Sequence, residues 1–393
     1  MEPSPDDELM DQALALASEG TALASPNPRV GAVVTRDGKV VGRGWHRYDQ
    51  RTHAEMLALQ QAGEQARGGT LYVNLEPCCH QGRTPPCADA VIAAGVERVV
   101  AAMEDPNPLV AGQGFERLRA AGIAVTVGCR QLEAQRLNQS FAQWIRHRRP
   151  FVTLKAGMTL DGKIAAPPSR HTDGTRTHEW ITSEAARWHV QQLRHEQDAV
   201  LVGVGTVLAD NPWLTDRTGH PRRRPLLRVV LDSRLRLPLD SRLVRTAHED
   251  VVVFCSHPEE RKRRQLEAAG VRVQQIATAG NAANAGTVAG ADWGGRPDPE
   301  RLLTQLGEWE ITSLIVEGGS VVNGMMLAMR AVDRVFLYYA PKLLGGAEGV
   351  PFAAGPGSPT IRGAMTLRDL RLHRFGPDFA VEGLLHDPYQ EDC

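Results

Sequence analysis

A small set of histidine, glutamate and cysteine residues limits what this chain can fold into more than any other part of its sequence. His53 and Glu55 are separated by one residue, and Cys78 and Cys87 follow in a segment rich in glycine and proline. Zinc takes tetrahedral nitrogen and sulfur ligands, and a catalytic zinc keeps one position open for water. His53, Cys78 and Cys87 supply three ligands, and Glu55 is placed to exchange protons with that water. The pattern therefore predicts a catalytic zinc site.

The cysteine spacing differs from the general pattern of zinc deaminases, in which His-x-Glu is followed by Pro-Cys-x-x-Cys. Here residues 79–86 lie between Cys78 and Cys87, and Cys79 and His80 are further possible ligands. The alternative interpretation is a structural zinc knuckle or a loop with buried thiols. Structural sites commonly use two Cys-x-x-Cys pairs, and the sequence has no such pair. We therefore favour the catalytic site.

The surroundings of this site resemble the deaminase domain of the RibD family, the bifunctional proteins of riboflavin biosynthesis. The segments that carry the resemblance are Ser25–Val34, His53–Glu55 and Pro77–Cys87. The Gly-Arg-Thr-Pro-Pro sequence inside the last segment separates this family from cytidine and tRNA-adenosine deaminases. The resemblance implies one Zn²⁺ per chain, with Glu55 as general acid and base. The substrate contacts that it implies are Asn27, His46, Arg83, Asp105 and Asn107.

Without the resemblance, these contacts have plainer interpretations. A lone histidine such as His46 is most often a satisfied loop residue. Asn27 and the segment 105–108 are typical turn sequences, because Asp, Asn and Pro favour turns. The segment 105–108 nevertheless follows a predicted strand at its carboxyl end, where ligands bind in open α/β sheets.

The hydrophobic pattern of the first part of the chain alternates between helix and strand. Helices are expected at 8–24, 53–62, 87–94, 114–121 and 131–148, and strands at 30–34, 39–44, 70–75, 96–103 and 123–127. This alternation predicts a three-layer α/β/α domain, which the resemblance makes cytidine-deaminase-like. A length of 393 residues suits two domains. Pro150 follows a basic helix end, so we expect a deaminase domain at 1–149 and a reductase domain at 150–393.

The second domain opens with residues 151–165, a predicted strand that enters a glycine turn. This segment resembles the start of the RibD reductase domain, which has a dihydrofolate-reductase-like α/β fold. Later segments resemble the same domain in order, so that the resemblance covers about residues 8–385. It implies NADPH as the cofactor. The cofactor contacts that it implies are Met158, Trp180, Thr206, Asp210, Ser233, Gly318, Gly319 and Ser320. The implied substrate contacts are His178, Arg194, Leu214, Arg217 and Glu317.

Local sequence supports these assignments to different degrees. Residues 318–320 lie between a predicted strand and helix, where backbone N–H groups can approach a phosphate, although a tight turn is the plainer interpretation. The Gly-x-Gly-x-x-Gly pattern of a Rossmann domain is absent. The arginines within 217–236 resemble a solvated face, yet a ribosyl phosphate needs guanidinium groups. Thr159 and His178 occupy positions where the family usually has serine. An inactive reductase domain is therefore an alternative.

Composition limits the possible partners. A net charge of −1 argues against a nucleic-acid-binding protein, and no apolar run is long enough to span a bilayer. Six cysteines do not suggest a disulfide framework. We therefore expect a cytoplasmic protein with a small phosphorylated pyrimidine as substrate, and no nucleic-acid or membrane partner. A homo-oligomer is also expected, with residues 342–346 completing either the fold or a dimer interface.

The resemblance implies two successive reactions. Zinc-bound hydroxide deaminates 2,5-diamino-6-ribosylamino-4(3H)-pyrimidinone 5′-phosphate. NADPH then reduces the ribosyl group of 5-amino-6-(5-phosphoribosylamino)uracil to ribityl. A nucleic-acid base deaminase and a zinc-binding scaffold are the two alternative functions. A nucleic-acid base deaminase would need a basic or aromatic face for the flipped base, and a zinc-binding scaffold would not need Glu55.

Overall fold

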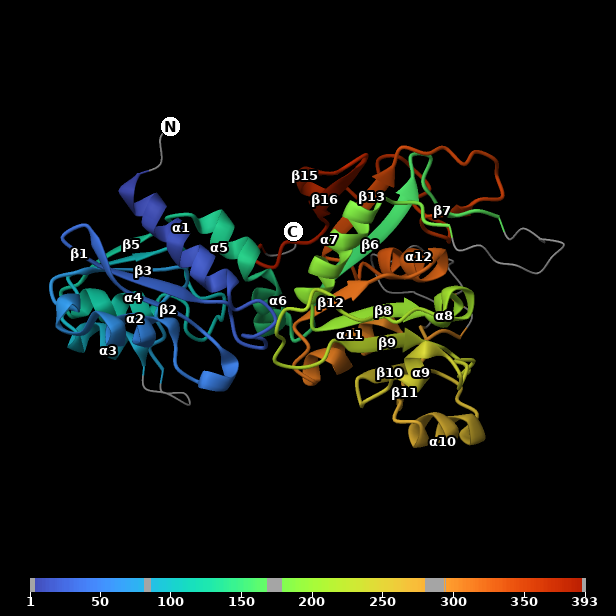
Figure 1. Cartoon of the computed structure of the whole chain (residues 1–393), viewed down its shortest axis with the longest axis horizontal. Coiled ribbons are helices and arrows are strands. Elements are labelled where there is room, and N and C mark those ends of the chain that lie inside the picture. Colours follow the sequence, from blue (N-terminus) through green and yellow to red (C-terminus); the bar gives the residue numbers. More distant parts are fainter. Residues whose placement is uncertain (1–3, 81–85, 168–178, 280–292, 294, 391–393) are drawn as a thin grey trace. The chain divides into compact units, whose positions relative to one another are not determined.

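The computed structural model of the chain describes residues 4–80, 86–167, 179–279, 293 and 295–390 (Figure 1). It divides into two compact units. The first consists of residues 1–148 with the short segments 221–224 and 388–391, and the second contains the remainder of the chain. Hydrophobic clusters of buried residues lie within each unit, so each has a core of its own.

The first unit is built on a five-stranded sheet with the order β2-β1-β3-β4-β5. β1 is antiparallel to β2 and β3, whereas β3, β4 and β5 are parallel to one another. The strands are β1 (Gly31–Arg36), β2 (Lys39–Trp45), β3 (Thr70–Val73), β4 (Arg98–Ala101) and β5 (Ala124–Val127). The helices are α1 (Pro5–Ser18), α2 (Ala54–Ala62), α3 (Cys87–Ala93), α4 (Gln113–Ala120), α5 (Gln131–Leu137) and α6 (Gln139–His147), with short 3-10 turns at Tyr48–Gln50 and Gly63–Ala66.

Helices cover both faces of this sheet. In Figure 1, α1 and α5 lie on one face, and α2, α3 and α4 lie on the other. The consecutive residues Val99, Val100 and Ala101 of β4 are all fully buried, as expected for a strand that is covered on both sides. The expected three-layer α/β/α architecture is confirmed.

One expected helix is in fact two. The periodicity predicted a single helix at 131–148, but the chain breaks between α5 and α6 at Asn138, where φ is −111° and ψ is 16°. The buried Asn138 side chain accepts a hydrogen bond from the N–H of Arg29 (2.8 Å) and donates one to the Arg29 carbonyl (3.0 Å). Asparagine side chains compete in this way with helical backbone hydrogen bonds. The partner is remote in sequence, so the periodicity could not reveal the break.

The second unit is built on a nine-stranded sheet with the order β11-β10-β9-β8-β12-β6-β13-β16-β15. The seven strands from β11 to β13 are parallel, and β16 and β15 add an antiparallel edge. The main strands are β6 (Phe151–Thr159), β8 (Ala199–Gly203), β9 (Leu227–Leu231), β10 (Val251–Cys255), β11 (Arg272–Gln275), β12 (Ser313–Val316), β13 (Arg334–Ala340), β15 (Arg368–Phe375) and β16 (Asp378–Leu384). A separate pair is formed by β7 (Lys163–Ala165) and β14 (Val350–Pro351).

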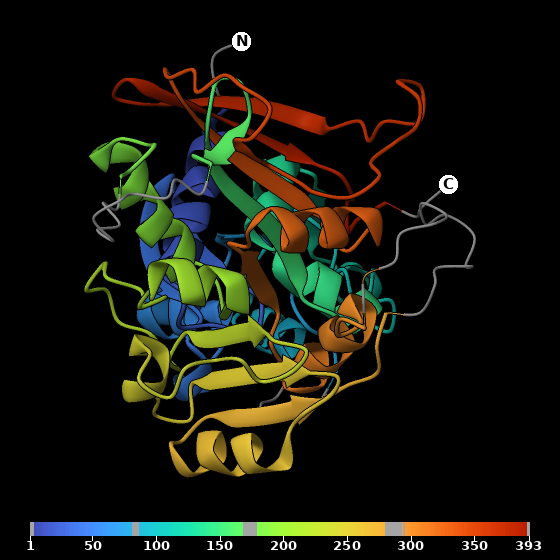
Figure 2. The same ribbon diagram turned by 90° about the vertical axis from the view of Figure 1, so that its right-hand side faces the viewer.

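The helices of this unit pack on both faces of the large sheet. They are α7 (Glu184–His195), α8 (Val204–Asp210), α9 (Arg242–Arg245), α10 (Glu260–Ala268), α11 (Pro299–Glu308) and α12 (Ser320–Ala328). Successive side chains of β8 alternate between two cores: Val200 and Val202 pack with α7, whereas Ala199 and Leu201 pack with α11 and α12. Figure 2 shows the sheet from a second direction, with α10 in gold at the β11 edge. The mixed α/β architecture expected here is also confirmed.

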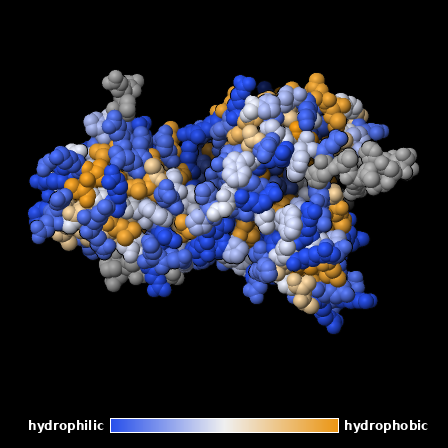
Figure 3. Space-filling model, in the orientation of Figure 1, coloured by the Kyte–Doolittle hydropathy of each residue, from blue (hydrophilic) through white to orange (hydrophobic). Residues whose placement is uncertain are grey.

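The face of the molecule shown in Figure 3 is mainly hydrophilic. Hydrophobic side chains there form small groups among hydrophilic ones. Among the described residues, no helix is both long enough and apolar enough to cross a membrane.

Candidate active sites

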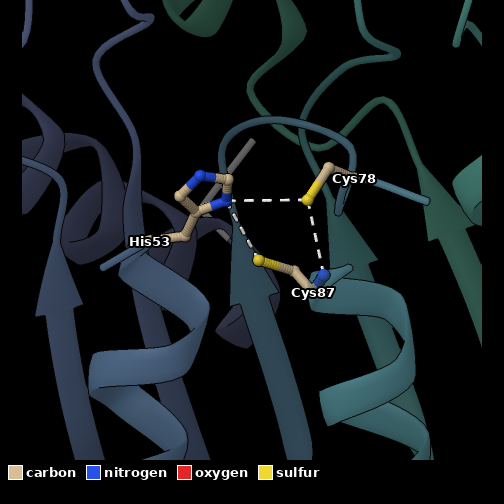
Figure 4. A group of neighbouring side chains, drawn as sticks. All are labelled: His53, Cys78 and Cys87. Atoms are coloured by element: carbon tan, nitrogen blue, oxygen red, sulfur yellow. Dashed lines mark hydrogen bonds between the residues drawn. The ribbon is translucent and has the colours of Figure 1, made fainter. Parts of the chain in front are cut away.

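Three predicted zinc ligands meet in the first unit (Figure 4). His53 precedes α2 as its N-cap, Cys78 follows β3, and Cys87 is the first residue of α3. His53 Nδ1 lies 3.1 Å from the Cys87 sulfur and 3.6 Å from the Cys78 sulfur, and the three ligand atoms lie within 4.8 Å of one another. One nitrogen and two sulfurs are donors that zinc prefers. Within the described parts of the chain, this is the group that could hold a metal ion.

Hydrogen bonds prepare the Cys78 sulfur for metal binding. Hydrogen bonds from Cys87 and His53 lower the pKa of the Cys78 thiol, and thiolate is the form of cysteine that binds metals. Cys79 and His80, the other possible ligands, do not belong to the group. The Cys79 sulfur instead faces the side-chain oxygen of Gln113 at 3.9 Å, and His80 is exposed.

Glu55 is the second residue of α2 and is 3% exposed. Its burial raises the pKa of the carboxyl group. His46 and Asn27, both predicted substrate contacts, lie beside the same ligand: the His46 ring packs edge-on against His53, with ring centroids 5.4 Å apart. Asn27 Nδ2 lies 3.0 Å from His46 Nε2, and His46 Nδ1 lies 3.0 Å from the Thr52 carbonyl. Since an amide nitrogen donates and a carbonyl accepts, these contacts assign His46 as the neutral tautomer protonated at Nδ1.

The other predicted substrate contacts of this unit lie after β4. Asp105 accepts a hydrogen bond from the N–H of Asn107 (2.8 Å), and the Asn107 side chain accepts one from the N–H of Leu109 (3.1 Å). These are turn contacts, as the plainer interpretation predicted. Burial raises the pKa of Asp105 to about 6. Arg83 lies outside the described residues.

Sequence reasoning gave no role to Glu76. Its buried carboxylate accepts hydrogen bonds from backbone N–H groups between Asp105 and Phe115. Because the partners are backbone groups, no pattern of residue types in the sequence predicts these hydrogen bonds. A charged residue directly before the Pro77–Cys78 metal segment was the available signal.

In the second unit, the predicted cofactor contacts gather at one edge of the sheet. β6, β12, β8 and β9 are adjacent and parallel, so their carboxyl ends meet at the edge where open α/β sheets bind ligands. The contacts at or just beyond these ends are Met158, Thr206, Ser233, Gly318, Gly319 and Ser320. Asp210 ends α8, the helix that carries Thr206. The exposed Trp180 lies before α7, and its carbonyl accepts a hydrogen bond from Lys342 Nζ at 3.0 Å.

The turn before α12 has features of a binding site. A Cβ atom on Gly318 would lie 2.7 Å from Cβ of Val322, so strand and helix pack there without room for a side chain. The nearest atom to a Cβ on Gly319 would be Thr206 Oγ1, at 3.6 Å. Among the described residues, the Ser320 hydroxyl and the Asn323 side-chain oxygen are buried without hydrogen-bond partners. Such groups fit a site whose ligand supplies the missing partners.

Two predicted substrate contacts of this unit bind each other. Arg194 donates to both carboxylate oxygens of Glu317, at 2.5 and 3.1 Å, and also to the Thr215 carbonyl at 3.1 Å. Lys155, which sequence reasoning missed although it lies in the opening segment, is 3.5 Å from Glu317. Burial alone would raise the pKa of Glu317, but Arg194 and Lys155 outweigh it and lower the pKa to about 2.

The other predicted substrate contacts of the second unit are Leu214, Arg217 and His178. Leu214 is buried, with a left-handed φ of 52°. Arg217 is exposed in the segment between α8 and β9. His178 lies outside the described residues.

Two matches to known protein families define the class of this protein. Residues 3–103 match the cytidine and deoxycytidylate deaminase zinc-binding region, and residues 150–381 match the RibD C-terminal domain. Together with the ligand geometry, these matches define a zinc-binding deaminase domain followed by a reductase domain.

The chain belongs to the RibD family of riboflavin biosynthesis proteins. It is 40% identical over 382 residues to RibD of Actinobacillus pleuropneumoniae, covering 97% of this chain and 96% of that protein. RibD of Escherichia coli is 39% identical over 388 residues, with 96% and 98% covered. The structure of Acinetobacter baumannii RibD superposes with a TM-score of 0.80 at 34% identity, covering 97% and 98% of the two chains. The sequence-based prediction of a bifunctional riboflavin biosynthesis enzyme, with deaminase and reductase activities, is thereby confirmed.

Proposed function

We propose that the domain at 1–149 deaminates 2,5-diamino-6-ribosylamino-4(3H)-pyrimidinone 5′-phosphate. The observation that carries this proposal is the convergence of His53, Cys78 and Cys87, with the buried Glu55 two residues from the histidine. A solved Thermotoga maritima structure supports the substrate class. It is described as a diaminohydroxyphosphoribosylaminopyrimidine deaminase/5-amino-6-(5-phosphoribosylamino)uracil reductase and matches with 34% identity and a TM-score of 0.76, covering 96% of this chain and 98% of that one.

His53, Cys78 and Cys87 hold one zinc ion per chain in this proposal. When bound, zinc lowers the pKa of a coordinated water. Glu55 takes one proton from the water as its oxygen adds to the amino-bearing ring carbon, and passes it to the ring nitrogen. It then takes the remaining hydroxyl proton and passes it to the amino group, which leaves as ammonia when the carbon–nitrogen bond breaks. The buried position of Glu55 keeps these transfers away from bulk water.

We assign substrate orientation in this domain to Asn27, His46, Asp105 and Asn107, and to Arg83. His46 lies against His53, and Asn27 in turn contacts His46. A neutral His46 offers no positive charge to the pyrimidine, so its contribution is orientation by hydrogen bonding. Burial lowers the pKa of His46, which supports the neutral form.

For the domain at 150–393, we propose NADPH-dependent reduction of the ribosyl group of 5-amino-6-(5-phosphoribosylamino)uracil to ribityl. When bound, NADPH supplies hydride to the ribose C1′. The Ser320 hydroxyl, which lacks a hydrogen-bond partner in the described part of the chain, and the tight Gly318 turn support a cofactor at α12. The proposed cofactor contacts are Met158, Trp180, Thr206, Asp210, Ser233, Gly318, Gly319 and Ser320.

In the same proposal, the substrate of this domain is bound by His178, Arg194, Leu214, Arg217 and Glu317. Because Arg194 is engaged with Glu317 and Thr215, its role is to fix these groups. The exposed Arg217 then recognises the phosphate. A cytoplasmic location and a homo-oligomeric state stay predictions from the sequence.

A coupled assay tests both halves of the proposal. Zinc-loaded protein is given the diaminopyrimidine ribosyl phosphate and NADPH, while ammonia release and NADPH oxidation are followed together. We expect both signals, with NADPH oxidation dependent on prior ammonia release. Ammonia without NADPH oxidation would contradict the reductase half, and the absence of both would contradict the substrate.

A further inference from the structure

The segment between β4 and α4 carries Asp105 and Asn107 and is tied to one buried carboxylate. Each oxygen of Glu76 accepts two backbone hydrogen bonds from this segment or from the start of α4. The donors are the N–H groups of Asp105 (3.1 Å) and Gly112 (2.9 Å) to Oε2, and of Gly114 (2.7 Å) and Phe115 (3.4 Å) to Oε1. Both ends of the segment are therefore fixed by a single side chain.

Glu76 also replaces a missing helix cap. α4 begins after Gly112, which has a φ of 80° and no side chain that could accept from the first turn. The carboxylate of Glu76 accepts those hydrogen bonds instead, and its negative charge lies at the positive end of the helix dipole. A carboxylate that is 4% exposed requires such partners.

The same residue is tied to the metal site by the backbone. Glu76 directly precedes Pro77 and the ligand Cys78, and its N–H donates to the Met103 carbonyl at 3.0 Å. A Cβ atom on Gly114 would lie 2.1 Å from the Pro77 carbonyl oxygen. The first turn of α4 thus packs directly on the backbone that leads to Cys78, so a shift of Glu76 moves both sides.

We propose that Glu76 is a positioning residue of the deaminase site, which holds the Asp105–Asn107 segment at a fixed place relative to Cys78. The proposal rests on the proposed function, because it takes Asp105 and Asn107 as substrate contacts. The hydrogen bonds of the Glu76 carboxylate go to backbone N–H groups of Asp105, Gly112, Gly114 and Phe115, which are not metal ligands. Glu76 acts through the segment that it anchors.

The test is Glu76→Gln, which keeps the size of the side chain but turns an N–H₂ group toward two backbone donors. We expect the zinc-loaded variant to bind one zinc per chain and to lose about 10- to 100-fold in deaminase kcat/KM, with a raised KM for the diaminopyrimidine ribosyl phosphate. The amides of Gly112 and Gly114 should exchange hydrogen faster. Reduction of the deaminated substrate should be unchanged.

The matched control is Asp6→Asn. Asp6 is a partly buried carboxylate of the first unit, and it accepts from Arg98 (2.6 and 3.0 Å) and from the Tyr72 hydroxyl (2.9 Å). Arg98 begins β4, whereas Asp105 follows the end of that strand. We expect the control to lower thermal stability while leaving kcat/KM and the exchange of Gly112 and Gly114 unchanged.

Several results would overturn the proposal. Wild-type kcat/KM in zinc-loaded E76Q would do so, as would an equal loss in the Asp6 control. The effects of E76Q and Asp105→Asn should be non-additive, so additive losses count against it. If E76Q fails to fold, wild-type kcat/KM in Glu76→Asp would make the residue purely structural. If the wild-type protein releases no ammonia, the proposed function fails, while the exchange of Gly112 and Gly114 still decides whether Glu76 fixes the segment.

Discussion

The two sites of this protein are built differently. In the deaminase unit, reactive side chains meet: His53, Cys78, Cys87 and Glu55 come from two helix starts and one loop. In the reductase unit, the candidate site is the edge of a sheet, made of strand ends and the turn before α12, and the ion pair of Arg194 with Glu317 lies where β12 ends. The chemistry of the first site is separable from its fold. In the second, residues that serve the site also hold the sheet together.

Glu55→Gln is the sharpest test of the separable site. The amide keeps the shape of the side chain but cannot take up a proton, so we expect deaminase kcat to fall by about 10²- to 10⁴-fold. Zinc content and reduction of the deaminated substrate should stay at wild-type levels. Loss of zinc, or of both activities, would show that Glu55 supports the fold. It would then contradict the difference between the two sites.

Arg194→Ala tests the opposite expectation for the reductase unit. Removing Arg194 leaves the largely buried Glu317 with Lys155, 3.5 Å away, as its remaining cationic partner, so we expect a loss of up to about 3–5 kcal/mol of folding free energy. Urea unfolding followed by amide exchange in β6 and β12 should show this loss, and NADPH oxidation should disappear. The control is Arg217→Ala, because Arg217 is exposed; it should weaken substrate binding without changing stability. Equal stability of the two variants would contradict the contrast.

The same ion pair makes the reductase unit sensitive to acid. Glu317 has a pKa of about 2 in the folded protein, against an ordinary value of 4.5, so the unfolded state binds more protons between these values. Its contribution to stability is therefore complete above about pH 4.5 and is lost as the pH falls toward about 2. Amide exchange in β12 should accelerate over this range more in the wild-type protein than in Glu317→Gln. Identical pH profiles of amide exchange in the two proteins would show that Glu317 is not the source of the acid sensitivity.

Ser320→Ala should have the smallest effect. The hydroxyl has no hydrogen-bond partner among the described residues, so the protein without cofactor should keep its thermal stability. A hydrogen bond to bound NADPH is worth about 0.5–1.5 kcal/mol, which corresponds to a KM for NADPH raised by about 2- to 12-fold. An unchanged KM would place the cofactor away from α12.

The sequence predicted the deaminase site more fully than the reductase site for a physical reason. Metal ligands must be particular residue types, so His53, Cys78 and Cys87 could be identified from identity and spacing alone. Strand-end backbone has no such requirement, and Gly318 by itself was weak support for a phosphate site. The reductase contacts therefore depended on the family resemblance.

What the sequence left unpredicted are hydrogen bonds between distant residues. Asn138 splits a helix because it pairs with the backbone of Arg29, and Glu76 caps a helix that begins well after it. Arg194 was expected to contact the substrate, and no sequence pattern predicted that it also pairs with Glu317. Periodicity reports which face of an element is buried, and it carries no information about such pairs.

The strand order of the two sheets has a consequence for synthesis on the ribosome. In the order β2-β1-β3-β4-β5, each new strand finds a neighbour that is already made. In the large sheet, β6 emerges first but lies between β12 and β13, which begin at residues 313 and 334. β6 thus waits unpaired while most of its domain is translated, and unpaired strand edges attract other chains. We therefore expect the nascent reductase half to need chaperones more than the deaminase half does.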